Sequence, residues 1–457
     1  MDRIGVRTAI DGASFIRATG NTVWWGTSEA RVERFAESAL GWQIPRAELD
    51  PLLLADAEAA GATVVRGAVV RDVVVGSDTV EGPVVHFDVD ERSRSIAARW
   101  VLDCTGRSGL LARRGWRRAD PSARTLAVVG TWERVGGWEQ LADPTHTLVE
   151  SYDGGWAWSV PVSRDRRYVT VMVDPALTDV RASGSADRLT NVYAGELAKA
   201  PRLEGLVRSG SRASRASRLT SAPFARDASS YDATRVAEDG VLLDGDAASF
   251  IDPLSSYGIK KALASAWLAS VVVHTALGDD AMRTPALELY ERRERAVYDA
   301  LRRRFTELSR EALGTATTDF WRARSERDRD DPGEHAAAGE PDVAAFRRDP
   351  DVLAALDAMR QRASVALRPS ARLVRVNRPT VRGDRVALEE HLVVPAFRDG
   401  VRYLRSVDLV TIVALAPGYD QVPDLFAAYN RAAPPAPLPD FLGALSVAVG
   451  KGILDLA

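Results

Sequence analysis

Lysine and cysteine are scarce in this chain. Of its 60 basic residues only four are lysines, so few side chains can supply a reactive amine; they are Lys199, Lys260, Lys261 and Lys451. The single cysteine, Cys104, excludes an internal disulfide. The five histidines are scattered without the spacing of metal ligands, and we predict no metal site.

An excess of charge and long apolar runs are also missing. The net charge of −3 over 457 residues provides no electrostatic basis for binding nucleic acid. No apolar run has the length of a membrane span, and the N-terminus has no apolar leader segment. We therefore expect a cytoplasmic protein that binds neither nucleic acid nor membrane.

The glycine fingerprint G-x-G-x-x-G of dinucleotide-binding domains is absent, yet a second part of such a site is present. The apolar run 240–244 leads into Gly245 and Asp246, and a loop with Pro253 precedes a small-residue helix from Gly258. Here an aspartate accepts hydrogen bonds from sugar hydroxyls, and the helix N-terminus faces phosphate. We interpret the segment as a dinucleotide site; the alternative is an aspartate that only caps a helix.

Three further segments contain candidate ligand contacts. A buried strand ends at Thr105 and Gly106, where a glycine allows a ligand to approach the backbone closely. Arg46 begins a helix and could pair with a phosphate, although a solvated first turn explains it equally well. Trp156 and Trp158 stand two residues apart in a predicted strand and share one face. They could separate a cofactor from a substrate pocket, or belong to an ordinary aromatic core.

The order of the predicted elements indicates an α/β fold with several parts. We predict a partial dinucleotide-binding domain (1–125), an antiparallel β-sheet substrate domain (126–235), a return to the first domain (236–280), a charged helical segment (281–324), a linker (325–344) and a C-terminal winged-helix-like module (345–457). Locally, the patterns predict a helix over 45–60, strands beginning at 63–65 and over 68–75, 84–89 and 385–394, and helices over 409–415, 422–430 and 438–450.

Together these motifs resemble the flavin-dependent halogenases and the related single-component FAD monooxygenases, over about residues 5–310. The resemblance implies a Rossmann-type FAD-binding domain with an inserted β-sheet substrate domain. It implies cofactor contacts at Arg46, Thr105, Gly106, Gly245, Asp246, Pro253, Gly258 and Ile259. Through the W-x-W-x-V-P signature and the loop after the proline, it implies substrate or tunnel contacts at Trp156, Trp158, Pro161, Ser255 and Ser256.

Two departures from that family affect the interpretation. Its first βαβ unit is missing, because the similarity begins about fifty residues into the fold, so we expect an N-terminal truncation. The family's lysine in an F-V-x-K-x-G segment is also missing: Ala18 occupies that position in the segment 15–26. The neighbouring Arg17 does not replace an amine, because its guanidinium remains protonated.

These features predict an FAD-dependent monooxygenase that hydroxylates an aromatic substrate, including a peptide- or carrier-linked one, through a flavin hydroperoxide. Electrons would come from NAD(P)H or a flavin reductase. One alternative is a halogenase in which Lys260 or Lys261 replaces the missing lysine, although a structural role suits both better. Another is a flavin-free homologue that acts as a binding protein. We assign no catalytic residue.

Overall fold

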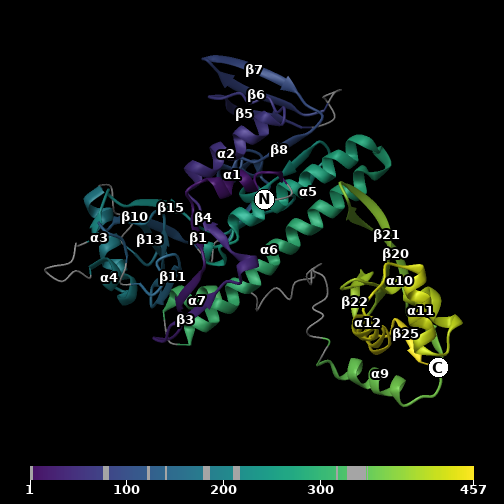
Figure 1. Ribbon diagram of the computed structural model, residues 1–457. Coiled ribbons are helices and arrows are strands. Elements are labelled where there is room, and N and C mark those ends of the chain that lie inside the picture. Colours follow the sequence, from purple (N-terminus) through teal and green to yellow (C-terminus); the bar gives the residue numbers. More distant parts are fainter. Residues whose placement is uncertain are drawn as a thin grey trace. The chain divides into compact units, whose positions relative to one another are not determined.

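The chain folds into two compact units in the computed structural model (Figure 1). The structure describes residues 4–75, 82–120, 124–138, 141–178, 186–208, 217–314, 318–326, 346 and 348–456. Unit 1 comprises Met1–Thr234, Leu243–Leu263 and Tyr298–Gly333, and unit 2 comprises Arg235–Leu242, Ala264–Val297 and Glu334–Ala457. The chain passes between the units within β18 (Val241–Leu243), α5 (Gly258–Gly278) and α6 (Arg283–Leu313).

An eight-stranded sheet dominates unit 1. Its order is β14 (Arg218–Leu219), β10 (Leu126–Glu133), β13 (Arg166–Val173), β12 (Gly155–Pro161), β11 (Thr147–Tyr152), β2 (Gly20–Trp24) and β3 (Arg31–Arg34), and β15 (Phe224–Asp227) also pairs with β10. The pairing between β11 and β2 is parallel. The predicted β-sheet domain begins at residue 126, but the observed sheet also contains β2 and β3, which precede that boundary. Local patterns do not show a parallel pairing between strands so distant in sequence.

The two faces of this sheet pack against different helices because side chains alternate along each strand. On the face that we call the α3 face, Leu148, Tyr152 and Ala157 pack with residues of α3 (Ala186–Leu197) and α4 (Pro201–Arg208). On the opposite face, which we call the tryptophan face, Trp156 packs with the end of α6 and with α7 (Asp319–Ser325).

Smaller elements complete unit 1. They are α1 (Arg7–Gly12), β1 (Ile16–Ala18), β4 (Gly41–Gln43), α2 (Arg46–Ala59), β5 (Val69–Val74), β6 (Val84–Val89), β7 (Arg92–Ala97), β8 (Val101–Asp103), β9 (Arg117–Ala119) and β16 (Tyr231–Ala233). Strands β5, β6 and β7 form an antiparallel sheet. The predicted strand start at 63–65 is wrong: this β-branched stretch lies outside any strand, because ladder partners rather than residue preference define a strand.

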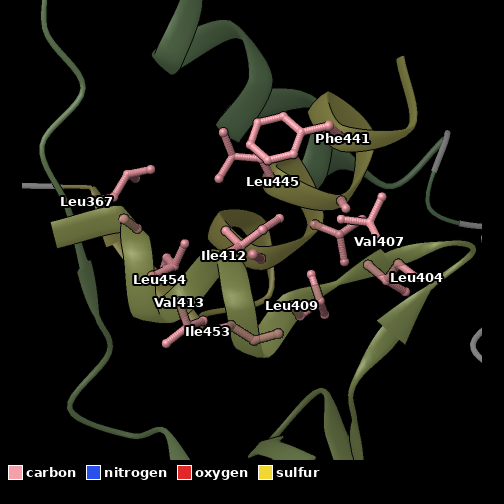
Figure 2. Close-up of a cluster of buried hydrophobic side chains, with 14 of the residues drawn as sticks. Leu367, Leu404, Val407, Leu409, Ile412, Val413, Phe441, Leu445, Ile453 and Leu454 are labelled. Carbon is pink, nitrogen blue, oxygen red and sulfur yellow. The ribbon is translucent and has the colours of Figure 1, made fainter. Parts of the chain in front are cut away.

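Unit 2 contains the C-terminal segment. Its elements are β17 (Ala237–Glu238), α9 (Pro350–Arg360), β19 (Leu367–Pro369), β20 (Val374–Arg382), β21 (Arg385–Val394), β22 (Phe397–Val401), β23 (Tyr403–Leu404), β24 (Val407–Asp408), α10 (Leu409–Leu415), α11 (Val422–Ala432), α12 (Leu438–Gly450) and β25 (Leu454–Leu456). The predicted bounds of β21, α10 and α12 are confirmed. Figure 2 shows the core of this unit, where Leu409, Ile412, Phe441 and Leu445 meet. The winged-helix assignment stays a prediction.

Two expectations have different outcomes. The predicted linker, 325–344, lies outside the described residues apart from Ser325, the last residue of α7, and Glu326. We expected no apolar segment long enough to span a membrane. That expectation is wrong, because the 21-residue helix α5 is long enough and apolar enough to do so by length and composition. A buried core helix meets them equally, and 44% of the apolar window is buried within the protein.

The core of unit 2 can be tested at Phe441, which is fully buried. We expect Phe441→Ala to lower the free energy of unfolding by about 3–5 kcal/mol, because the change leaves a cavity. Denaturant titration monitored by hydrogen exchange of α10–α12 measures the effect. The matched control is Leu438→Ala on the same helix, where the side chain is 46% exposed. An equal loss in both variants would contradict the assignment of the core.

Candidate functional site

Two of the predicted ligand segments meet in unit 1. The backbone N–H of Asp244 donates to the carbonyl of Asp103 at 3.0 Å, which joins the end of β8 to the Gly245 turn. The short 3-10 turns Gly106–Ser108 and Gly245–Ala247 follow directly. The structure therefore brings the Thr105-Gly106 and Gly245-Asp246 pairs together, although six of the eight strands of the large sheet lie between them in the chain.

The Gly245 turn depends on a glycine and on a buried lysine. Gly245 has φ +55°, and a Cβ there would lie 3.1 Å from the Cβ of Ala262. Lys261 is 6% exposed, and its Nζ donates to the carbonyls of Gly245 and Ser249 at 2.7 Å each. This amine therefore holds the loop in shape, which agrees with the structural role expected for it.

A half-buried carboxyl, that of Asp246, stands at the centre of the turn. Burial raises the pKa of Asp246. The positive charges that act against this shift belong to Lys261, Arg107 and Arg46. Arg46 pairs with Asp50 at 2.7 Å in the first turns of α2, and this bond raises the pKa of Arg46. The predicted residues Arg46 and Asp246 thus belong to one electrostatic site.

Sequence reasoning missed the aromatic and cationic wall of this site. The Arg107 guanidinium lies 4.1 Å from the ring centroid of Phe250 and 5.1 Å from that of Tyr231. Arg117 lies 3.9 Å from the Tyr231 ring and donates to the Arg107 carbonyl at 2.9 Å. The Tyr231 hydroxyl donates to the Asp246 carbonyl at 2.6 Å, and burial raises the pKa of Tyr231 to about 12. Arg107 directly follows Thr105-Gly106, a signal that could have identified it.

The charges of this site fit a sugar diphosphate such as the one in FAD. Burial lowers the pKa of Arg117, and its Nε and Nη2 have no hydrogen-bond acceptor among the described residues. Arg46 and Arg107 pair with Asp50 and Asp227, whereas Arg117 is opposed by the like charges of Arg107 and Arg113, a repulsion that a bound anion would offset. Asp246 can accept from a sugar hydroxyl. The N–H and the hydroxyl of Thr105 both donate to Asp103, so these donors already have an acceptor within the protein.

The loop after Asp246 links this site to the predicted tryptophan wall. Phe250 and Leu254 pack on the same cluster as Trp156 and Trp158, whose ring centroids are 6.0 Å apart. The prediction that both tryptophans face one side of the sheet is confirmed. Ile259 instead packs with the cluster around Leu49 of α2. The loop therefore spans from the tryptophan face to the helix that contains Arg46.

The remaining predicted contacts lie around this loop. Pro253 begins the short turn Pro253–Ser255, Ser256 has a left-handed backbone with φ +50°, and Gly258 starts α5. Pro161 ends β12, where its register partner is Arg167. Cofactor or substrate contact by these residues stays a prediction.

The position of the missing lysine is occupied by a buried alanine. Ala18 lies in β1 and is 9% exposed. Arg17 extends to Asp11, at 3.1 Å, and stacks 4.7 Å from the ring centroid of Trp42. The described structure therefore places no amine within this segment. Of the lysines elsewhere, Lys260 lies over the Tyr257 ring, at 4.9 Å, and Lys261 is bound by two carbonyls.

The role of Lys261 in holding the Gly245 loop can be tested without any cofactor. We expect Lys261→Met to destabilise unit 1 by about 1–3 kcal/mol for each carbonyl that loses its donor. Hydrogen exchange of the 245–256 backbone measures this local effect. Lys260→Met, a change at the adjacent exposed residue, is the control. Equal exchange rates in the two variants would show that Lys261 does not hold the loop.

Residues 26–353 match the family described as Tryptophan halogenase. The Tryptophan 2-halogenase of Chondromyces crocatus is 26% identical over 301 residues, which cover 64% of this chain and 55% of that protein. The 1H-pyrrole-2-carbonyl-[peptidyl-carrier protein] chlorinase of Pseudomonas fluorescens is 28% identical over 241 residues, or 50% and 49% of the two chains. This chain thus spans about half the length of these curated relatives.

Two solved structures share the fold. The flavin-dependent halogenase CmlS superposes with a TM-score of 0.75 at 20% identity, covering 99% of this chain and 86% of its own. The peptidyl tryptophan dihydroxylase QhpG superposes with a TM-score of 0.62 at 23% identity, covering 93% and 83%. These similarities confirm a mixed α/β fold. The Rossmann-type topology and the N-terminal truncation stay predictions.

Proposed function

This chain belongs to the tryptophan halogenase family of flavin-dependent enzymes, and from that premise we propose that it binds FAD at Gly245–Ile259 and oxidises an aromatic substrate. The observation that carries the proposal is the half-buried carboxyl of Asp246 in the Gly245 turn, with the charges of Arg46 and Arg107 acting on it and Arg117 stacked on the neighbouring Tyr231 ring. Bound FAD would supply the oxygen activation for this chemistry.

The residues of the site divide the work of holding this cofactor. The three arginines neutralise the diphosphate, and Asp246 accepts a hydrogen bond from a sugar hydroxyl. Phe250 and Leu254 carry the apolar surface of the loop to the tryptophan face. There the indoles of Trp156 and Trp158 exclude water from the reacting groups.

The two candidate reactions, hydroxylation and halogenation, differ in whether they need a lysine amine. The halogenases of the family support halogenation, which is the second candidate here. Ala18 at the lysine position and the clamped amine of Lys261 support oxygen transfer, and the dihydroxylase of similar fold agrees with it. Hydroxylation of an aromatic ring, free or linked to a peptide or carrier, is therefore the favoured reaction.

Cofactor binding is tested by titrating the chain with FAD and following flavin fluorescence. We expect Asp246→Ala to weaken binding by about 10- to 100-fold, the loss of one hydrogen bond to a charged group. Asp56→Asn, a change at an exposed carboxyl on α2, serves as the control and should leave the affinity unchanged. Absence of flavin binding by the unaltered chain would favour the alternative of a flavin-free binding protein.

The reaction is tested with reduced FAD, labelled oxygen and a tryptophan-containing peptide or free indole as probes. For the unaltered chain we expect a product that gains labelled oxygen at the same rate with or without bromide, measured by mass spectrometry. Ala18→Lys restores the family's amine, and we expect it to add a bromide-dependent product. A brominated product from the unaltered chain would instead establish halogenation without that lysine.

A further inference from the structure

Helices α9 and α12 of unit 2 are tied together at one end. Gly450, the last residue of α12, lies against the start of α9, where a Cβ on it would be 2.8 Å from the Asp351 carbonyl oxygen and from the Cα of Val352. Beside it, the Lys451 Nζ pairs with Asp349 at 2.6 Å and with Asp351 at 3.2 Å. The start of α9 is therefore fixed to the end of α12, and only a glycine allows so close an approach.

A cavity lies between the same two helices. Its volume is about 480 Å³, within the range of roughly 300–1,000 Å³ that small-molecule sites occupy. Most of its wall is aliphatic and includes Leu353 and Leu356 of α9 and Leu438, Leu442 and Val447 of α12. Leu353 is 45% exposed and Leu438 is 46% exposed. Large apolar side chains therefore remain accessible within a concave site, an arrangement typical of a binding site.

Helix α9 has two apolar stripes. Val352, Ala355 and Met359 are buried at the i, i+3, i+7 spacing of a stripe that faces the core. Leu353 and Leu356 are also three residues apart, and they line the cavity instead. The second stripe gives α9 an apolar surface that the core of unit 2 does not fully cover.

A glycine in the middle of α12 keeps part of the cavity open. Gly443 lines the cavity, and a Cβ built on it would meet no atom of another described segment within 4 Å. Close packing therefore does not require glycine here, in contrast to Gly450 at the end of the same helix. Glycine weakens the interior of a helix relative to alanine. The room that Gly443 leaves, at the expense of helix stability, is available to a ligand.

The charged lining residues carry an excess of one positive charge. Among the described residues of the wall they are Arg360, Arg405 and Asp440. Arg405 lies in the turn between β23 and β24 with φ +54°, a conformation that non-glycine residues rarely adopt, and it pairs with Asp440. The Arg360 side chain is 69% exposed and lies 4.0 Å from Asp357. Both guanidinium groups can therefore still donate to an anionic group.

We propose that the cavity between α9 and α12 binds a free medium-chain aliphatic carboxylate. The alkyl chain packs along Leu353 and Leu438, whose exposed apolar area it removes from water. The carboxylate accepts hydrogen bonds from Arg360 and Arg405 and neutralises the excess positive charge of the wall. The site belongs to unit 2 alone and does not depend on the proposed FAD site.

The lining selects an alkyl chain over an aromatic ring. Phe346 is the one aromatic residue among the described residues of the wall, and its ring already packs edge-on against Phe397, with centroids 5.8 Å apart. Leucine and valine side chains provide the rest of the apolar surface, which suits a flexible hydrocarbon.

Calorimetric titration of the full chain with decanoate and with 1-decanol tests both parts of this ligand. We expect one decanoate per chain, bound at least about 10-fold more tightly than 1-decanol, because the neutral alcohol forms no ion pair with the arginines. Arg405→Gln should weaken decanoate binding by about 10-fold and leave 1-decanol binding unchanged. Arg405→Lys, which retains the charge, should restore most of the affinity for decanoate.

Gly443→Leu tests where the alkyl chain lies, because the new side chain fills the cavity and leucine favours a helix more than glycine does. We expect both ligands to lose their binding while the thermal midpoint of unfolding stays the same or rises, which separates a filled site from an unfolded one. The control is Gly195→Leu, the same change at an exposed glycine of α3 in unit 1, and it should leave decanoate binding unchanged.

The other outcomes each overturn the proposal. Many decanoate molecules per chain, with Gly443→Leu binding as many, would show nonspecific adsorption. Equal affinities for decanoate and 1-decanol would remove the arginines from the site. Absence of decanoate binding would exclude the ligand. If Gly443→Leu then also disrupted a dimer in analytical ultracentrifugation, the occupant of the cavity would be a second copy of this chain.

Discussion

The buried amine of Lys261 is the contact on which the rest of the site depends. Its Nζ donates to the carbonyls of both Gly245 and Ser249. These two hydrogen bonds fix the conformation of the loop between the two residues. An unpaired amine at 6% exposure would be costly to bury, which makes the closed loop the favourable state. Asp246 and Phe250 take their positions from this loop.

The large sheet contributes a second constraint, the strict alternation of its side chains. Trp156 and Trp158 project to one face, and Ala157 between them projects to the other. Trp24, the last residue of β2, packs on the α3 face, and Trp25, directly after the strand, packs on the tryptophan face. One sheet can therefore pack an aromatic cluster on one face and helices α3 and α4 on the other.

Family membership and local chemistry point to different details of the reaction. The match over residues 26–353 identifies a family of flavin-dependent halogenases. Ala18 removes the amine at the family's lysine position, and Lys261 already uses its amine for the loop. The fold accommodates both halogenation and hydroxylation, since a halogenase and a dihydroxylase share it.

The sequence by itself determined the local features of this protein. Helical periodicity placed α12, alternation placed β21, and residue types identified Asp246 and the tryptophan pair, because each depends on neighbours in the chain. Tertiary structure decided what no local pattern contains: the parallel pairing of β2 with β11, and the placing of Arg107 and Arg117 around Tyr231. These contacts join segments about a hundred or more residues apart in the chain, and only the packing of the folded chain brings them together.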